Sequence, residues 1–302
     1  MSIKSSASDR VFGAVNTALL VFALLAVLYP LYFVLIASIS EPYAVGTGKI
    51  RFLPIGFTMD GYLNVFINKE IWTGYRNSMF YTVIGTLLNL FMTIPTAYAL
   101  SKRQLPFRNG ISIYFLFTMY FGGGMIPYYL LVKSLGLINQ PYTMIILGGV
   151  SVFNIVVTRT YFQTAIPEEL YEAAFIDGAS EGWSFIRIAI PLAAPIISVI
   201  TLYYAVGRWN DYFSALIFLP NRDYHPLQMV LRGILTKNQK ATSQIIISST
   251  NTQEFQDKAR LAYIAESMKY ALIYIASAPM LILYPFVQKH FVKGVMIGSL
   301  KG

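Results

Sequence analysis

The chain contains no cysteine and is poor in charged residues. Without cysteine it has no disulfide, no thiolate nucleophile and no cysteine-based metal site. Asp, Glu, Lys and Arg together supply 12% of its 302 residues, about half the share found in soluble domains. These absences leave a chain with little polar surface, in which long stretches carry no charge.

Hydrophobic residues make up 56% of the chain, and its mean hydropathy is +0.55. Charge-free intervals of 19 to 30 residues cover 11–40, 77–101, 109–132, 134–158, 188–207 and 270–288. A membrane-spanning helix needs about 20 mostly apolar residues, and buried helices of soluble proteins rarely run this long without a charge. We therefore predict an all-α integral membrane protein with six transmembrane helices in a single domain, residues 1–302. The expected spans are about 11–39, 77–100, 110–132, 142–162, 186–206 and 270–288.

Lys4 and Arg10 precede the first span as in a signal peptide, but its apolar run is longer than the roughly 7–15 residues of a cleavable signal, which favours a retained helix.

The short loop after the second span carries Lys102, Arg103 and Arg108, and the loop after the third carries only Lys133. The positive-inside rule then places both termini and the loop 165–187 in the cytoplasm. Loops 41–76 and 208–269 are expected outside, and the many basic residues of the second weigh little because long loops count little in this rule. The net charge of +9 contains no basic run of five, so it does not indicate a nucleic-acid partner.

Helix-breaking residues fall inside two predicted spans. Pro95 interrupts the second, and Gly122-Gly123-Gly124 with Pro127 interrupts the third. Broken backbone at membrane depth is tolerated where it lines a pathway or is buried in protein, and small residues also serve close helix packing. Both interpretations stay open. Asn89 and Asn154 are polar groups within spans, and we favour hydrogen bonding to a neighbouring helix for them.

The polar loop between the fourth and fifth spans has the signals of a helical hairpin. Pro167 suits the first turn of a helix, and Glu168 and Glu169 complement its positive end. Gly178 suits a left-handed helix end, and Ser180 suits the cap of a second helix. From these residues alone, an ordinary hairpin at the membrane interface and a docking loop both remain possible.

A further pattern runs through this loop: Glu-Ala-Ala, three residues, Gly, nine residues, then Ile-x-Ile-Pro. It resembles the signature loop of ABC importer membrane subunits, in which the third position of the last element is usually leucine. The matching residues are Glu172, Ala173, Ala174, Gly178, Ile188 and Pro191. Asn77-Ser78, Trp209-Asn210-Asp211 and the tail from Phe291 are similar to the carbohydrate-uptake, MalG-like branch of this family. The run from Phe121 to Pro127 is similar to its LplC/YtcP-like subgroup, which the resemblance links to oligosaccharides of complex polysaccharides.

The resemblance implies a type I ABC importer permease in the bacterial cytoplasmic membrane. It implies a second, homologous permease subunit, two cytoplasmic ATPase subunits and an extracytoplasmic solute-binding protein that delivers an oligosaccharide. ATP and Mg would be bound by the ATPases and no cofactor by this chain, which would be non-catalytic. Carried over, the ATPase-coupling residues are Glu172, Ala173, Ala174, Asp177 and Gly178. The tail 293–302 is a second candidate for ATPase contact.

The residues themselves agree with an ATP site on another chain. Gly48-Lys49 is similar to the end of a P-loop, but Tyr43 stands where its first glycine is needed and Ile50 replaces Ser or Thr. His225 and His290 fall on opposite predicted sides, so they are interpreted as structural or surface residues rather than as metal ligands.

Aromatic and amide groups suited to binding a sugar gather at the outer end of the fifth span. The candidates for the substrate pathway are Tyr203, Tyr204, Trp209, Asn210 and Asp211. Aromatic belts also mark membrane interfaces in general, so this alternative stays open.

Three alternatives to an oligosaccharide importer are an ABC importer for a different solute, an ion-coupled secondary transporter and a membrane enzyme. A secondary transporter usually needs a charge deep in a span, and the predicted spans have none. An enzyme would have to use the acidic group from Glu168 to Glu181, which includes no histidine and no paired metal motif.

Overall fold

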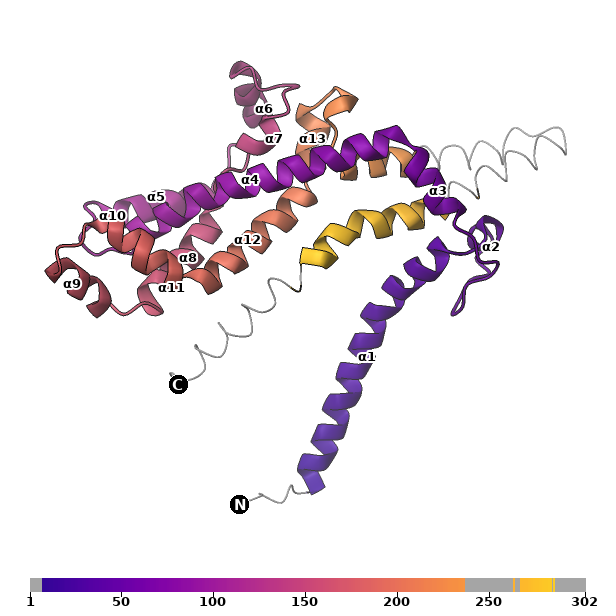
Figure 1. Ribbon diagram of the computed structural model, residues 1–302, viewed down its shortest axis with the longest axis horizontal. Coiled ribbons are helices and arrows are strands. Elements are labelled where there is room, and N and C mark those ends of the chain that lie inside the picture. The colour runs from indigo at the N-terminus through magenta and orange to yellow at the C-terminus, as the bar shows by residue number, and fades with distance from the viewer. Residues whose placement is uncertain (1–6, 237–262, 264–266, 284, 286–302) are drawn as a thin grey trace. The chain divides into compact units, whose positions relative to one another are not determined.

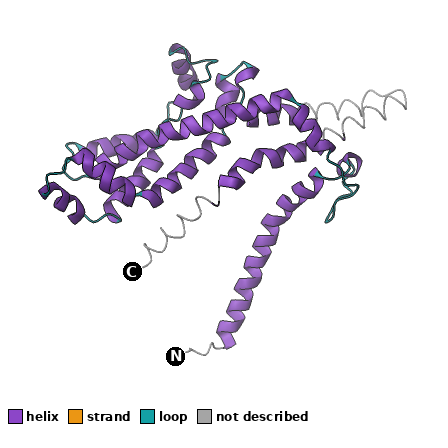
Figure 2. Ribbon diagram, in the orientation of Figure 1, coloured by secondary structure: helices purple, strands orange, loops and turns teal. Residues whose placement is uncertain are grey.

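The computed structural model describes residues 7–236, 263, 267–283 and 285. Within these residues the regular elements are helices, and β pairing is limited to one isolated antiparallel bridge between Ser40 and Phe57 (Figure 2). The all-α expectation is therefore confirmed for the described part. The tail 293–302, His290 and the end of the last predicted span lie outside it.

The contacts divide the chain into two units, which are described separately. The first contains α1 (Ala7–Ser38), α2 (Pro42–Gly46) and α3 (Asp60–Ile67). Ile36 and Ala37 at the end of α1 pack with Ala44, Val45 and Ile50 in a small buried cluster. The rest of α1 is a continuous apolar helix with large exposed side chains, as expected of a helix that faces lipid.

The second unit contains the site. Its helices are α4 (Lys69–Ser101), α5 (Arg108–Tyr120), α6 (Met125–Ser134), α7 (Thr143–Ile146), α8 (Val152–Thr164), α9 (Glu169–Ile176), α10 (Glu181–Ser184), the π-helix η1 (Phe185–Ala189), α11 (Ile190–Leu192), α12 (Ala194–Trp209), α13 (Phe213–Phe218) and the 3-10 turn η2 (Arg222–Tyr224). Two further helices cover Leu227–Thr236 and Ser267–Leu283, and residues 231–277 count with the first unit.

The largest buried cluster joins α4, α8 and α12, which lie together in Figure 1. Ala97 and Tyr98 come from α4, Ile155 and Phe162 from α8, and Ile200 from α12. Small Ala189 and Ala193 complete it and are fully buried. This bundle is the frame to which the loop between α8 and α12 is attached.

Two described helices, α1 and α4, are long and apolar enough to cross a bilayer as they stand. The number becomes four if each of two bent pairs counts as one span. The membrane character follows from these helices, whereas the count of six spans in one domain stays a prediction. Helix α4 begins at Lys69, before the expected start at residue 77, and Gly74 in this added part lies against Leu227 and Val230.

The two expected helix interruptions differ. Helix α4 continues through Pro95, so this proline does not end the helix. The glycine run does break the third predicted span, because α5 and α6 are separate helices bent by 111°. Gly124 has φ +82°, and an added Cβ at Gly122, Gly123 or Gly124 would meet no described atom within 4 Å. Gly124 thus serves the backbone geometry of the break, and none of the three glycines packs closely against another described residue.

The fourth and fifth predicted spans are also interrupted. Residues 147–151 separate α7 from α8, and Gly148 there has φ +68°. Before α12, the helix widens into η1 and bends by 78° around Ala193. Pro191 lacks an N–H and its ring crowds the preceding turn, and both prolines and π-helical turns are recognised causes of helix bending.

Candidate functional site

The loop between α8 and α11 has the helix, glycine turn and second helix at the residues expected from the sequence. Pro167 precedes the N-cap of α9, Glu168, while Glu169 and Glu172 lie in its first turn. Carboxylates there complement the positive end of the helix dipole. The proline thus lies just before the helix instead of in its first turn.

The end of α9 is a Schellman motif. Gly178 has φ +79°, and its N–H donates to the Phe175 carbonyl at 3.0 Å. The Ala179 N–H donates to the Ala174 carbonyl at 2.9 Å, and these two bonds define the motif. The Oγ of Ser180 then accepts a hydrogen bond from the Trp183 N–H at 3.3 Å and caps α10. The turn between the two helices is therefore fixed by the backbone.

The tip of this hairpin is apolar and exposed. Phe175 and Ile176 are 80% and 83% exposed, while the neighbouring Ala174 is 7% exposed and anchors the helix. An open groove of about 640 Å³ is lined by Ala173, Ala174, Asp177 and Gly178 and does not include Phe175 or Ile176. Large exposed apolar side chains at such a tip are suited to contact with another protein.

The predicted coupling residues lie around this tip. Ala173, Ala174, Asp177 and Gly178 line the groove, and Glu172 is exposed on α9. Within the described residues there is no group of three His, Asp or Glu side chains that could hold a metal ion. The hairpin tip thus combines exposed apolar side chains with acidic groups on one helix.

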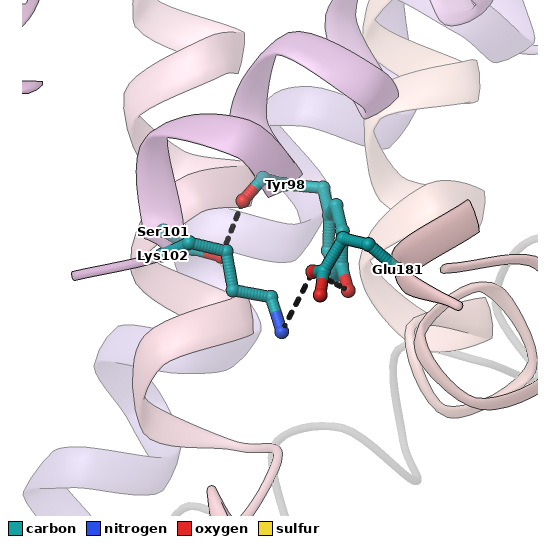
Figure 3. A network of polar contacts seen from close by, with 4 residues as sticks. All are labelled: Tyr98, Ser101, Lys102 and Glu181. Atoms are coloured by element: carbon teal, nitrogen blue, oxygen red, sulfur yellow. Dashed lines mark hydrogen bonds and ion pairs between the residues drawn. The ribbon is translucent and has the colours of Figure 1, made fainter. Parts of the chain in front are cut away.

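A polar network attaches the hairpin to the C-terminal end of α4 (Figure 3). The Tyr98 hydroxyl donates to Glu181 Oε1 at 2.6 Å, and Lys102 Nζ lies 3.1 Å from the same oxygen. The ammonium also lies 3.4 Å from the ring centroid of Tyr171 on α9. Tyr98 packs on Phe185 with a centroid distance of 4.8 Å. Sequence reasoning missed this network, whose members are up to 83 positions apart.

The network sets the ionisation of its members. Burial raises the pKa of the Glu181 carboxyl, but the hydrogen bonds from Tyr98 and Lys102 and the Lys102 charge outweigh this effect, so the pKa is below its ordinary value. Burial, with the Glu181 charge, raises the pKa of Tyr171 to about 12. At neutral pH a carboxylate therefore faces an ammonium and neutral phenols.

At the other end of α12, Arg208 forms a hub that sequence reasoning also missed. Its Nη1 donates to the carbonyls of Met144 and Leu147, both at 2.6 Å. Its Nη2 donates to the carbonyls of Ile145 and Gly148 at 3.1 and 3.0 Å. Arg208 thereby caps the C-terminal end of α7, whose last carbonyls have no partner within the helix.

Asn89 of α4 completes this hub. Its Oδ1 accepts a hydrogen bond from Arg208 Nε at 3.0 Å, and its Nδ2 donates to the Gly148 carbonyl at 2.7 Å. The side chain is fully buried. Asn89 thus bonds to neighbouring elements, as favoured from the sequence. The only signal for Arg208 in the sequence is its position, since it is the charged residue that ends the charge-free interval 188–207.

The five pathway candidates are distributed over the end of α12. Tyr203 is exposed, whereas Tyr204 is 7% exposed and its hydroxyl lies 2.6 Å from Thr93 Oγ1. Trp209 is 1% exposed and packs edge-on against Tyr75. Asn210 donates to the Val206 carbonyl, and Asp211 Oδ1 accepts from the Ser214 N–H. These contacts give four of the candidates a structural role, and their contact with substrate stays a prediction.

Asn77 and Ser78, noted in the sequence, hold the segment that follows α13. Asn77 Nδ2 donates to the carbonyls of Asp223 and His225 at 2.7 and 3.1 Å. Ser78 Oγ accepts from the Leu227 N–H at 2.8 Å. The N-terminal part of α4 is therefore fixed to segment 223–227.

Comparison with known proteins agrees with this architecture. Residues 71–297 match the family model described as "Binding-protein-dependent transport system inner membrane component". Protein LplC of Bacillus subtilis is 38% identical over 301 residues, which cover 100% of this chain and 98% of LplC. The polygalacturonan/rhamnogalacturonan transport system permease protein YtcP of the same species is 38% identical over 285 residues, or 94% of this chain and 96% of YtcP.

A solved structure is similar over nearly the whole chain. It is a chain of a bacterial ABC transporter involved in the import of the acidic polysaccharide alginate. The TM-score is 0.83 and the identity 36%, with 96% of this chain and 100% of that chain covered. The similarity thus extends to the fold as well as to the sequence.

Proposed function

This chain belongs to the family of inner membrane components of binding-protein-dependent transport systems, and we propose that the solute it carries is an oligosaccharide derived from a complex polysaccharide. The chain is a permease subunit of an ABC importer. The proposal for its cargo is supported by the similarity to YtcP, a polygalacturonan/rhamnogalacturonan permease, and to the alginate importer. The alternative is an ABC importer for a different solute.

We further propose that α9 couples this permease to a cytoplasmic ATPase. The observation that carries this role is the exposed pair Phe175 and Ile176 at a tip fixed by the Gly178 turn. Apolar anchors surrounded by a polar rim are typical of protein interfaces. Glu172 and Asp177 would supply the polar rim.

The assembly that this role requires has a second, homologous permease, two ATPases and an extracytoplasmic binding protein. ATP and Mg belong to the ATPases, and the permease chain is non-catalytic. Six spans, with both termini and loop 165–187 on the cytoplasmic side, would place α9 on the side where ATP is available. The basic loop after α4 supports this orientation.

Docking of α9 can be tested with single cysteines, because the chain has none of its own. Ile176→Cys is expected to crosslink to the ATPase through a short bifunctional reagent in membranes that contain the assembled transporter. Arg103→Cys, an exposed position in the neighbouring cytoplasmic loop, is the control and is expected to crosslink at least about tenfold less. Equal crosslinking of the two positions would contradict docking through the tip.

The cargo can be tested with the transporter reconstituted in liposomes. ATP hydrolysis is measured while binding protein is added with acidic oligosaccharides, neutral oligosaccharides or amino acids. We expect at least about a fivefold stimulation by one oligosaccharide class, since the loaded binding protein must engage the permease before the ATPases close. Stimulation by amino acids alone would exclude an oligosaccharide as the cargo.

A further inference from the structure

Four side chains from three elements meet where the hairpin joins the bundle: Tyr98 near the end of α4, Lys102 just after it, Tyr171 on α9 and Glu181 at the start of α10. We refer to these four residues as the clamp. Figure 3 shows Tyr98 and Lys102 both directed at the Glu181 carboxylate. Lys102 therefore contacts both helices of the hairpin, Glu181 by charge and Tyr171 through the face of its ring.

The burial pattern of the clamp differs from that of an ordinary surface ion pair. The Lys102 side chain is 20% exposed, although that of Glu181 is 67% exposed. Tyr98 is 6% exposed and packs edge-on against Phe162 of α8 and against Tyr171. Exposed ion pairs contribute little to stability, so we assign this contact a role in orientation. Lys102 and Tyr98 share the Glu181 Oε1 atom. The Lys102 ammonium also lies over the rings of Tyr98 and Tyr171, so these contacts together define its position.

The clamp connects the hairpin to two long helices. Tyr98 belongs to the end of α4 and Lys102 follows it directly, while Glu181 begins the helical run that continues through η1 and α11 to α12. A movement of α9 alone would break the Lys102–Tyr171 contact. While the clamp holds, α9 and α10 move together and act on α4 and on the helix that precedes α12.

We propose that the clamp makes Tyr98, Lys102 and Glu181 positioning residues for energy coupling. They keep the hairpin rigid, so that displacement of α9 by the ATPase is transmitted to the spans instead of being absorbed in the loop. This inference rests on the proposed docking of α9. It predicts that loss of the clamp leaves the ATPase bound while less solute is carried for each ATP hydrolysed.

The test is a double-mutant cycle in the reconstituted transporter, with Lys102→Met, Glu181→Gln and the double variant. Solute imported per ATP hydrolysed is expected to fall about fivefold or more in each single variant and no further in the double variant, because both changes remove the same contact. Arg103→Met, an exposed basic neighbour, is the matched control and is expected within twofold of the parent. Unchanged import per ATP in both single variants, or a double variant whose loss is the product of the single losses, would overturn the proposal.

A second variant and a second readout separate this result from misfolding and from a failure of docking. Tyr98→Phe removes one oxygen and keeps the packed ring, so it is expected to lose part of the coupling at unchanged protein yield. The Ile176→Cys crosslink is measured in every variant and is expected to persist. Absence of the crosslink in the parent would remove the docking role of α9, whereas an intact crosslink with normal import per ATP would remove the clamp alone.

Discussion

Replacement of Gly178 by valine is expected to lower solute import at least about tenfold while the protein is inserted in the membrane at its normal level. The cause is the backbone, because Gly178 has φ +79° and an added Cβ would meet no atom within 4 Å. Left-handed backbone costs an L-residue about 1–2 kcal/mol, and it is least tolerated by β-branched side chains. The turn would therefore relax toward negative φ, and the tip with Phe175 and Ile176 would change direction.

The matched control is Gly182→Val. Gly182 lies in α10, and an added Cβ there would also meet nothing within 4 Å, but no left-handed φ is required. The measurement is import by the reconstituted transporter, with membrane insertion assayed by the yield of the full-length chain. Equal import by the two valine variants would show that the direction of the tip is not important. Gly178→Pro would in addition remove the N–H that donates to Phe175 and is expected to be at least as severe.

The hairpin could be predicted because its signals are local. Gly178 and Ser180 determine the turn and the cap within a few residues, and each lies where the sequence expects it. The glycine run 122–124 is likewise a local signal, and it does separate α5 from α6. Pro95 shows the limit of such signals, since α4 continues through it because the surrounding bundle overrides a local preference.

The hub and the clamp could not be predicted because they depend on contacts between distant segments. Arg208 bonds to carbonyls about 60 positions earlier in the chain. These carbonyls point to one place only because α7 ends there. Tyr98 and Glu181 are separated by 83 positions. Nothing in the sequence around Lys102 distinguishes it from Arg103, although one side chain is largely buried and the other is exposed.

Arg208→Met is expected to lower the thermal unfolding midpoint of the detergent-solubilised protein by roughly 5–20 °C. The guanidinium donates to four carbonyls and to Asn89, and each buried acceptor left without a partner costs about 1–3 kcal/mol. Two such acceptors would cost roughly 2–6 kcal/mol, and 1 kcal/mol corresponds to about 2–4 °C for a domain of this size. Methionine retains the unbranched stem, so most of the loss comes from the polar contacts.

Lysine at this position is expected to recover less than about half of the lost stability. Its single ammonium cannot reproduce the planar fork that reaches Met144 and Leu147 through one nitrogen and Ile145 and Gly148 through the other. Arg222→Met, at an exposed arginine of η2, is the control and is expected to unfold within about 2 °C of the parent, since exposed substitutions usually change stability little. An Arg208→Met protein that unfolds with the control would show that the carbonyls of segment 144–148 find other partners. Arg208 uses its donors on the backbone of segment 144–148. A loss of stability in the Arg208→Met protein would therefore identify Arg208 as the residue that holds the predicted fourth span, which is broken at residues 147–151, against α4 and α12.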